Sequence, residues 1–216
     1  MNKIKDFKIL YLSPVEAEEW IMKKHYAKRK PSISFCFGLY RGNILEGIMT
    51  VGKPASPNLC DGICGKEYSD RVYELNRLCV NEGLPKNTLS FFVAGCLRRL
   101  NNEGHPEGLI LVSYADSAWG HHGYIYQATN WLYTGATKER TDIGFEDGKH
   151  SRHYSKEIDH SNRKFRSSKF RYVTFVGRKK REFRKALKYE IMPYPKGDNS
   201  RYDATYEPTT QCILGF

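Results

Sequence analysis

The sequence predicts an α/β protein with a mixed sheet: an antiparallel amino-terminal half, a parallel pair around a central helix, and helices on both faces. Apolar residues recur at helical spacing over 88–103, between strand-like runs at 72–80 and 109–115. A strand, a crossover helix and a second strand in this order form a parallel pair. The runs at 33–39 and 44–51 flank a turn and indicate an antiparallel hairpin.

The remaining elements follow from local signals. A first strand is expected at 8–12, and a helix begins after Ser13, because Ser13 can cap it and Glu16 can close a capping box. This helix is expected to run to about Tyr26. Residues 53–70 are rich in Pro, Gly and Ser and are expected to form a loop. Later elements are a short helix at 124–130, strands at 131–134 and 170–176, and a basic helix at 178–189.

Length and composition favour one domain. We expect a single catalytic domain at 1–190, including a basic insertion at about 138–169, and a C-terminal arm at 191–216. The sequence has no 18-residue apolar run and no apolar signal-peptide core, so we expect a cytoplasmic protein without a membrane segment. Its six cysteines are then expected to be reduced thiols, and Cys60-x3-Cys64 lacks the second ligand pair of a zinc site.

The stretch 113–135 concentrates polar side chains directly after a buried strand. Ser113, Tyr114 and Asp116 end that strand, and Tyr126 lies on the helix that follows. In open α/β sheets the chemistry sits just beyond the carboxyl ends of buried strands. We therefore take this stretch as the candidate active site.

Two other groups of polar residues are candidates for the same site. The strand at 72–80 carries Glu74 and Asn76 on one face and Arg77 on the other. These charges form either a structural ion-pair network or a wall of the site, and the wall is favoured because perturbed charges gather at sites. His25 and Tyr26, at the basic end of the first helix, are either functional or explained by the helix dipole.

The charge of the chain indicates an anionic partner. The formal net charge is +11, and residues 138–188 hold 17 Lys and Arg against 7 Asp and Glu. Aromatic residues interleave with the basic ones, a pattern typical of nucleic-acid binding, although a solvated basic surface is the plainer alternative. The candidate nucleic-acid contacts are Lys24, Arg29, Lys30, Arg163, Lys164, Arg166, Lys169, Arg178, Lys179, Lys180 and Arg181.

The order of elements resembles the layout of the GNAT acyltransferases. This resemblance implies that the strand ending at Val80 and the helix starting at Thr88 hold an acyl donor, and that the strand ending at Asp116 splays away to admit it. Residues 81–86 lack the glycine-rich turn that seats the pyrophosphate of CoA in that family. The donor-binding residues implied in this way are Leu78, Val80, Asn87, Thr88 and Ser90.

Four motifs are similar to the Mom family of phage DNA-modification proteins, over roughly the first 180 residues. They are HY at 25–26, ELNRLCV at 74–80, NTLS at 87–90 and SYADSAWGHHGYIYQATNWLYTG at 113–135. The resemblance implies a GNAT-like transferase that acts on double-stranded DNA. It would convert the exocyclic amine of adenine to a carbamoylmethyl derivative, so that the phage genome escapes host restriction.

Chemistry on a base inside a duplex requires that the base be flipped into a pocket and stacked there. Tyr114, Tyr124 and Tyr126 are available for stacking, whereas Trp131 is expected in the core. Tyr124 aligns with Trp131 at helical spacing and is expected to pack, which leaves Tyr126 to face the site beside Ser113.

The residues of the candidate site fit this activity. Asp116 would act as a base or as an anchor for the adenine amine, and Glu74 and Arg77 would orient the reacting groups. The hydroxyls of Ser113, Tyr124 and Tyr126 would donate to a developing oxyanion or to the leaving group. The alternative for Ser113 is that it only ends the strand, with its hydroxyl satisfied locally.

The group donor stays open between two candidates. A glycyl donor such as an aminoacyl-tRNA would supply every atom of the carbamoylmethyl group after rearrangement, and tRNA is then a further partner. An acyl-CoA is the usual GNAT donor, but acetyl-CoA lacks the nitrogen. A metal site built from His121, His122, His150, His153 and His160 is not favoured.

Two functions of other classes remain as alternatives. One is a DNA-binding module without catalysis, in which only the basic residues matter. The other is a GNAT acyltransferase that acts on a protein or small-molecule amine, for which DNA affinity and salt dependence are not expected.

Overall fold

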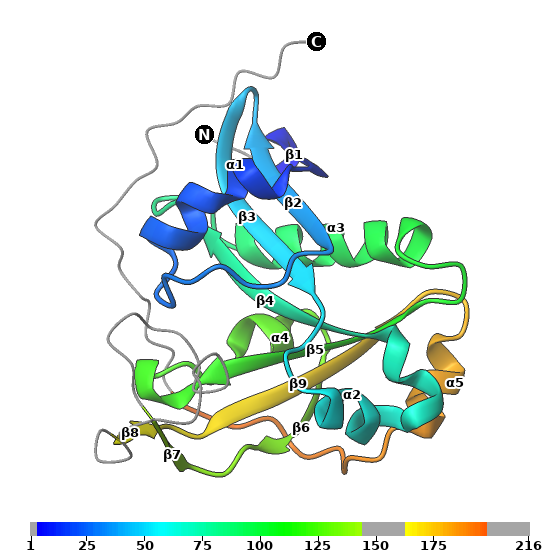
Figure 1. The fold of residues 1–216 in the computed structure, drawn as a ribbon. Coiled ribbons are helices and arrows are strands. Elements are labelled where there is room, and N and C mark those ends of the chain that lie inside the picture. The colour runs from blue at the N-terminus through cyan, green and yellow to red at the C-terminus, as the bar shows by residue number, and fades with distance from the viewer. Residues whose placement is uncertain (1–3, 144–162, 198–216) are drawn as a thin grey trace.

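The computed structural model describes residues 4–143 and 163–197, in which a seven-stranded sheet runs through the molecule (Figure 1). The strand order is β1-β2-β3-β4-β5-β9-β6, and each neighbouring pair in this sheet is antiparallel except β4 and β5. The predicted mixed sheet is therefore confirmed. The strands are β1 (Phe7–Tyr11), β2 (Phe35–Arg41), β3 (Ile44–Gly52), β4 (Val72–Val80), β5 (Leu109–Asp116), β6 (Leu132–Ala136) and β9 (Lys169–Val176).

Helices cover both faces of the sheet, as predicted. α3 and α4 pack on one face, where Phe92 and Trp131 are fully buried. On the other face, α1 and the turn after it bury Ala17 and Trp20 against the amino-terminal strands, and α2 and α5 pack with Val112 and Phe183 on the carboxyl-terminal ones. The helices are α1 (Pro14–Glu19), α2 (Pro57–Cys64), α3 (Thr88–Glu103), α4 (Tyr124–Ala128) and α5 (Lys180–Ala186). In the described part of the chain, none of them has the length and apolar character needed to cross a bilayer.

The first helix begins as predicted and ends in an unusual turn. Ser13 Oγ accepts from the Glu16 amide at 3.2 Å, and the Glu16 carboxylate accepts from the Ser13 amide at 3.0 Å. After Glu19 the helix widens into a π-helical turn, Trp20–Lys24, and the backbone becomes extended at His25. This turn carries His25 toward the carboxyl-terminal half of β4.

The predicted loop at 53–70 was wrong, and the basic insertion contains two strands. The stretch 53–70 contains α2, which Ser56 caps by accepting from the Leu59 amide at 3.3 Å, and a 3-10 helix, Lys66–Arg71. Cys60 and Cys64 lie one helical turn apart and face the core, where burial raises the pKa of Cys64 to about 12. The basic insertion holds a two-stranded sheet, β7 (Arg140–Ile143) with β8 (Arg163–Arg166).

The parallel pair β4–β5 separates after a short contact. Its ladder covers three residue pairs and ends at Glu74–Val112. Beyond this point β4 stays paired with β3 as far as Val80, and β5 stays paired with β9 as far as Asp116. The two strands diverge toward the left of Figure 1, which confirms the predicted splay.

A β-bulge lies in β4 directly after the point of divergence. Thr50 of β3 pairs with Arg77, whereas Val51 pairs with Leu75, so Asn76 is an extra residue. Thr50 Oγ1 donates to the side-chain oxygen of Asn76 at 2.6 Å. An extra residue shifts the alternation of side chains between the two faces, so side chains before and after Asn76 follow different patterns.

We predict that Phe183→Ala lowers the free energy of unfolding by about 3–5 kcal/mol, because this fully buried ring holds α5 on the sheet. Denaturant unfolding measures the effect. Lys185→Ala, at an exposed position of the same helix, is the control and should change stability by no more than about 0.5 kcal/mol. Equal losses in both variants would contradict the assigned packing.

Candidate active site

Ser113 bridges the two strands at the point where they separate. Its Oγ lies 2.7 Å from the Leu75 carbonyl oxygen and 2.7 Å from the Tyr126 hydroxyl. Ser113 has one hydroxyl proton and a carbonyl can only accept, so Ser113 donates to Leu75 and Tyr126 donates to Ser113. This chain satisfies a β4 carbonyl that has no β5 partner, and burial raises the pKa of Tyr126, which therefore stays protonated.

The two tyrosines of α4 are placed differently from the prediction. Tyr126 is 7% exposed and packs against Trp131 and Tyr172, with ring centroids 5.2 and 5.1 Å away. Tyr124 is 65% exposed, so the expectation that it packs was wrong. The prediction that the Tyr126 hydroxyl lies beside Ser113 is confirmed, and so is the prediction that Trp131 lies in the core.

The bulge brings Glu74 and Arg77 to the same face of the sheet, whereas the sequence pattern placed them on opposite faces. Leu75 faces α3, and without the extra residue Arg77 would do the same. Instead, an Arg77 terminal nitrogen donates to the Arg29 carbonyl at 2.6 Å, in the segment after α1. Glu74 and Arg77 are close enough for each to shift the pKa of the other.

Glu74 is a carboxylate without an ion-pair partner within 4 Å among the described residues. Burial raises the pKa of Glu74 above its usual value, and the charges of Arg77 and Lys169 oppose this only in part. A carboxylate with a raised pKa and no bound cation is suited to accept a proton. This is the property that a general base requires.

Arg77 is 8% exposed and its charge is not paired with a carboxylate among the described residues. Its terminal nitrogens donate to the carbonyls of Asn76 and Arg29, each at 2.6 Å. Its Nε is buried and has no hydrogen-bond partner in the described part of the chain. The guanidinium is thus held by the backbone with one donor still available.

His25 and Tyr26 complete this group of residues. The Nδ1 atom of His25 accepts from the Ala27 amide at 3.1 Å, so the ring proton is on Nε2. Burial lowers the pKa of His25 to about 3, and the ring is neutral at physiological pH. Tyr26 stacks on it at 4.4 Å, and burial together with the charge of Asp116 raises the Tyr26 pKa.

Asp116 holds the loop that follows β5. Its carboxylate accepts from Ser167 Oγ at 2.6 Å and from the Ala118 amide at 3.1 Å, and it pairs with Lys169 at 2.8 Å. Burial raises its pKa, but the hydrogen bonds from Lys169 and Ser167 outweigh this, so the pKa lies below its usual value. With three partners and a low pKa, Asp116 is better suited to anchor than to accept a proton.

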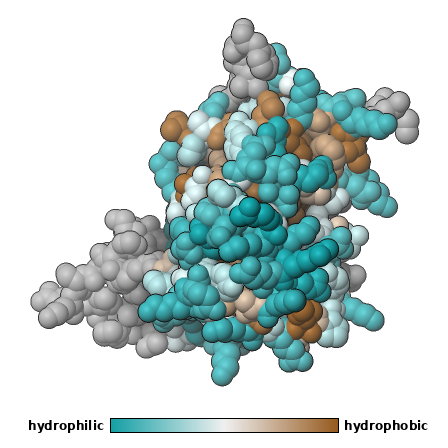
Figure 2. Space-filling view, turned by 90° about the vertical axis from the view of Figure 1, so that its right-hand side faces the viewer, coloured by the Kyte–Doolittle hydropathy of each residue, from teal (hydrophilic) through white to brown (hydrophobic). Residues whose placement is uncertain are grey.

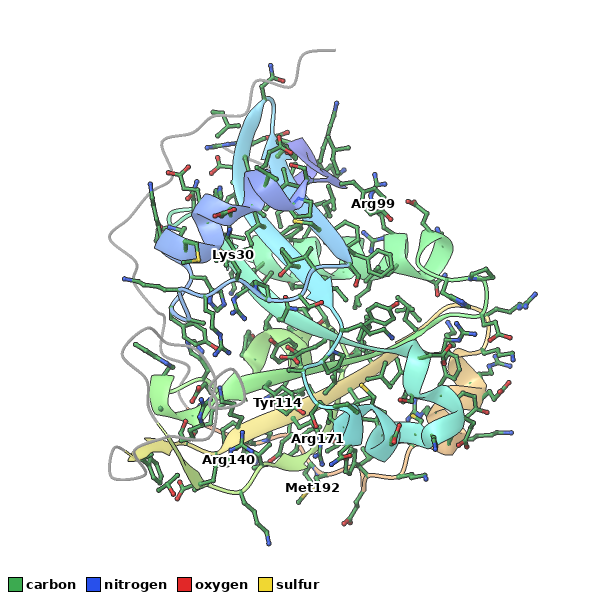
Figure 3. All side chains as sticks on the ribbon, in the orientation of Figure 1. Lys30, Arg99, Tyr114, Arg140, Arg171 and Met192 are labelled. Atoms are coloured by element: carbon green, nitrogen blue, oxygen red, sulfur yellow. The ribbon has the colours of Figure 1, made fainter. Side chains whose placement is uncertain are left out.

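Tyr114 lies on the face of α2 and α5, beside its β9 partner Arg171 (Figure 3). Burial and the nearby Glu74 charge raise its pKa. Ser113 faces the opposite side of the sheet, toward α3 and α4. The candidate residues therefore approach the splay from both faces.

The expected donor-binding residues lie along β4 and at the start of α3. Leu78 and Val80 are partly buried against the core under α3. Thr88 Oγ1 donates to the Pro85 carbonyl at 2.7 Å and Ser90 Oγ to the Asn87 carbonyl at 3.0 Å, so both hydroxyls have local partners. Asn87 has a left-handed φ of 69° and its side chain does not cap the helix.

The residues expected to contact nucleic acid lie in different parts of the structure. Lys24 is buried and pairs with Glu82 at 2.7 Å, so its placement on a basic surface was wrong. Arg29 and Lys30 are exposed in the segment after α1. Lys30 lies on the side where the strands splay (Figure 3), and the Arg29 carbonyl accepts from Arg77 of β4. Lys169 pairs with Asp116, and Arg166 ends β8 nearby; the side chains of Arg163 and Lys164 lie outside the described ones.

The other basic cluster is at the opposite end of the sheet. Arg178, Lys179, Lys180 and Arg181 follow the end of β9 that pairs with Leu109, one strand length or about 25 Å from Asp116. Lys179 pairs with Glu107 at 2.7 Å. The surface seen from the α5 side is largely hydrophilic (Figure 2).

The sequence pattern did not identify Trp119 or Ser167 as site residues, and it offered His121 only as a possible metal ligand. Trp119 is 45% exposed in the 3-10 turn after Asp116, 5.5 Å from the Tyr26 ring, and His121 meets Tyr26 edge-on at 5.8 Å. The described residues hold no cluster of three metal-binding side chains. The candidate ligands His150, His153 and His160 lie outside the described residues.

Comparisons with known proteins place the chain in a family. The model of the Mom protein family matches residues 6–196. Methylcarbamoylase mom of Escherichia phage Mu is 23% identical over 205 residues, which cover 89% of this chain and 85% of that protein.

Solved structures are similar at a lower level. An N-acetyltransferase from Staphylococcus aureus Mu50 is 12% identical with a TM-score of 0.47 and covers 77% of this chain and 96% of its own. The Escherichia coli ribosomal-protein-S18-alanine N-acetyltransferase is 8% identical with a TM-score of 0.46. That match covers 80% of this chain and 95% of the acetyltransferase. Similarities at this level carry no conclusion about function. The family model, by contrast, spans most of the chain, and the chain belongs to the Mom protein family.

Proposed function

We propose that the chain is a DNA-modifying transferase that converts the exocyclic amine of adenine in phage DNA to a carbamoylmethyl derivative and so protects the DNA from restriction. The observation that carries this proposal is membership of the Mom family, whose relative in phage Mu is named a methylcarbamoylase. The activity would take place in the cytoplasm of a bacterial host. The splayed site and the basic side chains around it support the same assignment.

In this proposal Glu74 accepts the proton that the adenine amine loses as it attacks the donor carbonyl. Its raised pKa and its lack of an ion-pair partner among the described residues favour this role over Asp116. Arg77, with a buried Nε that has no partner in that same part of the chain, donates to the oxyanion that develops. Asp116 anchors the loop, and Ser113 with Tyr126 holds the splay open.

The donor is either a glycyl ester such as an aminoacyl-tRNA or an acyl-CoA. With a glycyl donor, the adenine amine forms an amide and the donor alcohol leaves with the proton. The free glycyl amine then attacks the ring carbon through a five-membered ring, and the original amine nitrogen departs from that carbon as the terminal amide. Every atom of the product is accounted for, whereas acetyl-CoA would need a separate nitrogen source.

The nucleoside composition of plasmid DNA from cells that express the protein tests the function. A new deoxyadenosine derivative, heavier by the mass of one glycyl residue, is expected with the wild-type chain. If the DNA is unmodified while the purified protein binds duplex DNA, the chain is a binding module; if it neither modifies nor binds DNA, the acceptor is another amine.

Glu74→Gln should abolish modification with little change in DNA affinity, because the amide keeps the shape of the carboxylate but cannot accept the proton. The wild-type rate should rise with pH as the carboxyl deprotonates, through a pKa above the usual 4.5. Glu67→Gln, at an exposed site on the 3-10 helix, is the matched control. A Glu74→Gln enzyme with most of its rate, or a wild-type rate that falls over this pH range, would exclude the assignment.

Tyr126→Phe should lower the rate by about 10²-fold, because Ser113 loses the hydroxyl that orients it and the residues at the splay are misplaced. Tyr124→Phe, on the exposed face of the same helix, should leave the rate unchanged. Paired kinetic and melting measurements compare the two. An unchanged rate for Tyr126→Phe would remove the Ser113–Tyr126 pair from the mechanism.

Arg29→Ala combined with Lys30→Ala should weaken duplex binding and lower the slope of log affinity against log salt by about 0.9 for each phosphate that is no longer neutralised. Both side chains are exposed at the splayed end of the sheet. Arg178→Ala combined with Arg181→Ala removes equal charge at the opposite end and is the control. If only the control pair lowers the slope, DNA binds along α5 instead.

A further inference from the structure

Three aromatic rings form a ladder at the splayed end of the sheet. His25 stacks on Tyr26 with ring centroids 4.4 Å apart, and Tyr26 contacts Trp119 at 5.5 Å. His25 is buried at 6% exposure, Tyr26 is half-buried, and Trp119 at the outer end is 45% exposed. The ladder thus leads from the protein interior to a large exposed ring.

The backbone that carries the exposed Trp119 ring is held in a defined turn. It belongs to the 3-10 turn Ser117–Trp119, which Asp116 caps through the Ala118 amide. Gly120 ends the turn with a φ of 64°, which a residue with a Cβ adopts only with strain. The other two tryptophans, Trp20 and Trp131, are 2% and 0% exposed and belong to the core. A large ring that a fixed turn places at the surface is not explained by core packing.

The ladder stands beside polar groups that still have hydrogen-bonding capacity. Asp116 caps the turn that carries Trp119, and Arg77 donates to the Arg29 carbonyl three residues after Tyr26. The charges of Asp116, Arg77 and Glu74 also act on the pKa of Tyr26, so these groups lie near it. Arg77, more than nine-tenths buried, has an Nε without a partner among the described residues, and the Glu74 carboxylate has no ion-pair partner there. An aromatic surface next to an available donor and an available acceptor matches what a nucleobase offers: a π face and a hydrogen-bonding edge.

We propose that Trp119, supported by Tyr26 and His25, is the stacking platform for the target base, and that Arg77 and Glu74 meet the edge of that base. This inference rests on the proposed function and deepens it by naming where the flipped nucleotide lies. Two of the tyrosines that the sequence offered for stacking are replaced in this role, because Tyr126 is buried in the core and Tyr114 faces the α2–α5 side.

A single-stranded oligodeoxynucleotide tests the platform without the energy of base flipping. Two strands are compared, one with adenines and one with abasic sites at the same positions. Wild-type protein should bind the adenine strand more tightly, with quenched tryptophan fluorescence, because Trp119 is the exposed tryptophan. Trp119→Ala should remove a preference of roughly 5- to 150-fold, the range expected for one base–aromatic stack. Trp119→Phe should keep most of it.

Tyr11→Ala is the matched control, because Tyr11 is exposed to the same degree, 46%, on the edge strand β1. It should leave the preference for adenine unchanged. None of these variants removes a charge, so the salt dependence of binding should stay constant in all of them.

The outcomes separate this inference from the proposed function. Undiminished preference for adenine in Trp119→Ala overturns the platform, and modified DNA from wild-type cells would still support the function. A wild-type protein that binds both strands equally also overturns the platform. Preference for adenine that depends on Trp119, without any modified nucleoside in cells, supports the platform and contradicts the proposed transferase.

Discussion

The short ladder between β4 and β5 is the constraint on which the site depends. Once pairing stops at Glu74–Val112, the β4 edge must satisfy its backbone groups in another way, and Ser113 does so for the Leu75 carbonyl. A buried carbonyl left without a partner would cost about 1–3 kcal/mol. The hydroxyl of Tyr126 completes the arrangement by donating to Ser113 from α4. The separation of β4 from β5 would leave backbone groups unpaired, and these hydrogen bonds make it stable. Side chains approach the separated strands from both faces of the sheet.

The charged side chains near the separation of β4 and β5 differ in how many partners they have. Asp116 has three partners and a lowered pKa, whereas Glu74 has a raised pKa and Arg77 has a donor left over within the described residues. Buried charges without partners destabilise a fold, so their presence together is typical of a site that a ligand completes. Asp116, whose carboxylate has three partners, therefore holds the loop, whereas Glu74 and Arg77 remain available to a ligand.

The elements with strong local signals were predictable from the sequence. The helical spacing of 88–103, the hairpin and the capping box of Ser13 appear where the patterns placed them. The bulge at Asn76 was missed, although Leu75 and Leu78 face the same core three residues apart instead of two, and the bulge reverses the face of Arg77. α2 was missed because Pro and Gly in its sequence suggested a loop, although Ser56-Pro57 is a helix start. Lys24 was misplaced because charge alone does not show that Glu82 pairs with it.

In the proposed function, an adenine of DNA is bound between the ends of β4 and β5. Photo-crosslinking with DNA that carries 8-azidoadenine, followed by mass spectrometry of the crosslinked peptides, tests this placement. We expect crosslinks to peptides that contain Tyr26, Glu74 or Trp119, reduced by competing unmodified DNA. Crosslinks confined to α5 or to the far edge of the sheet would be incompatible with adenine binding at the splay.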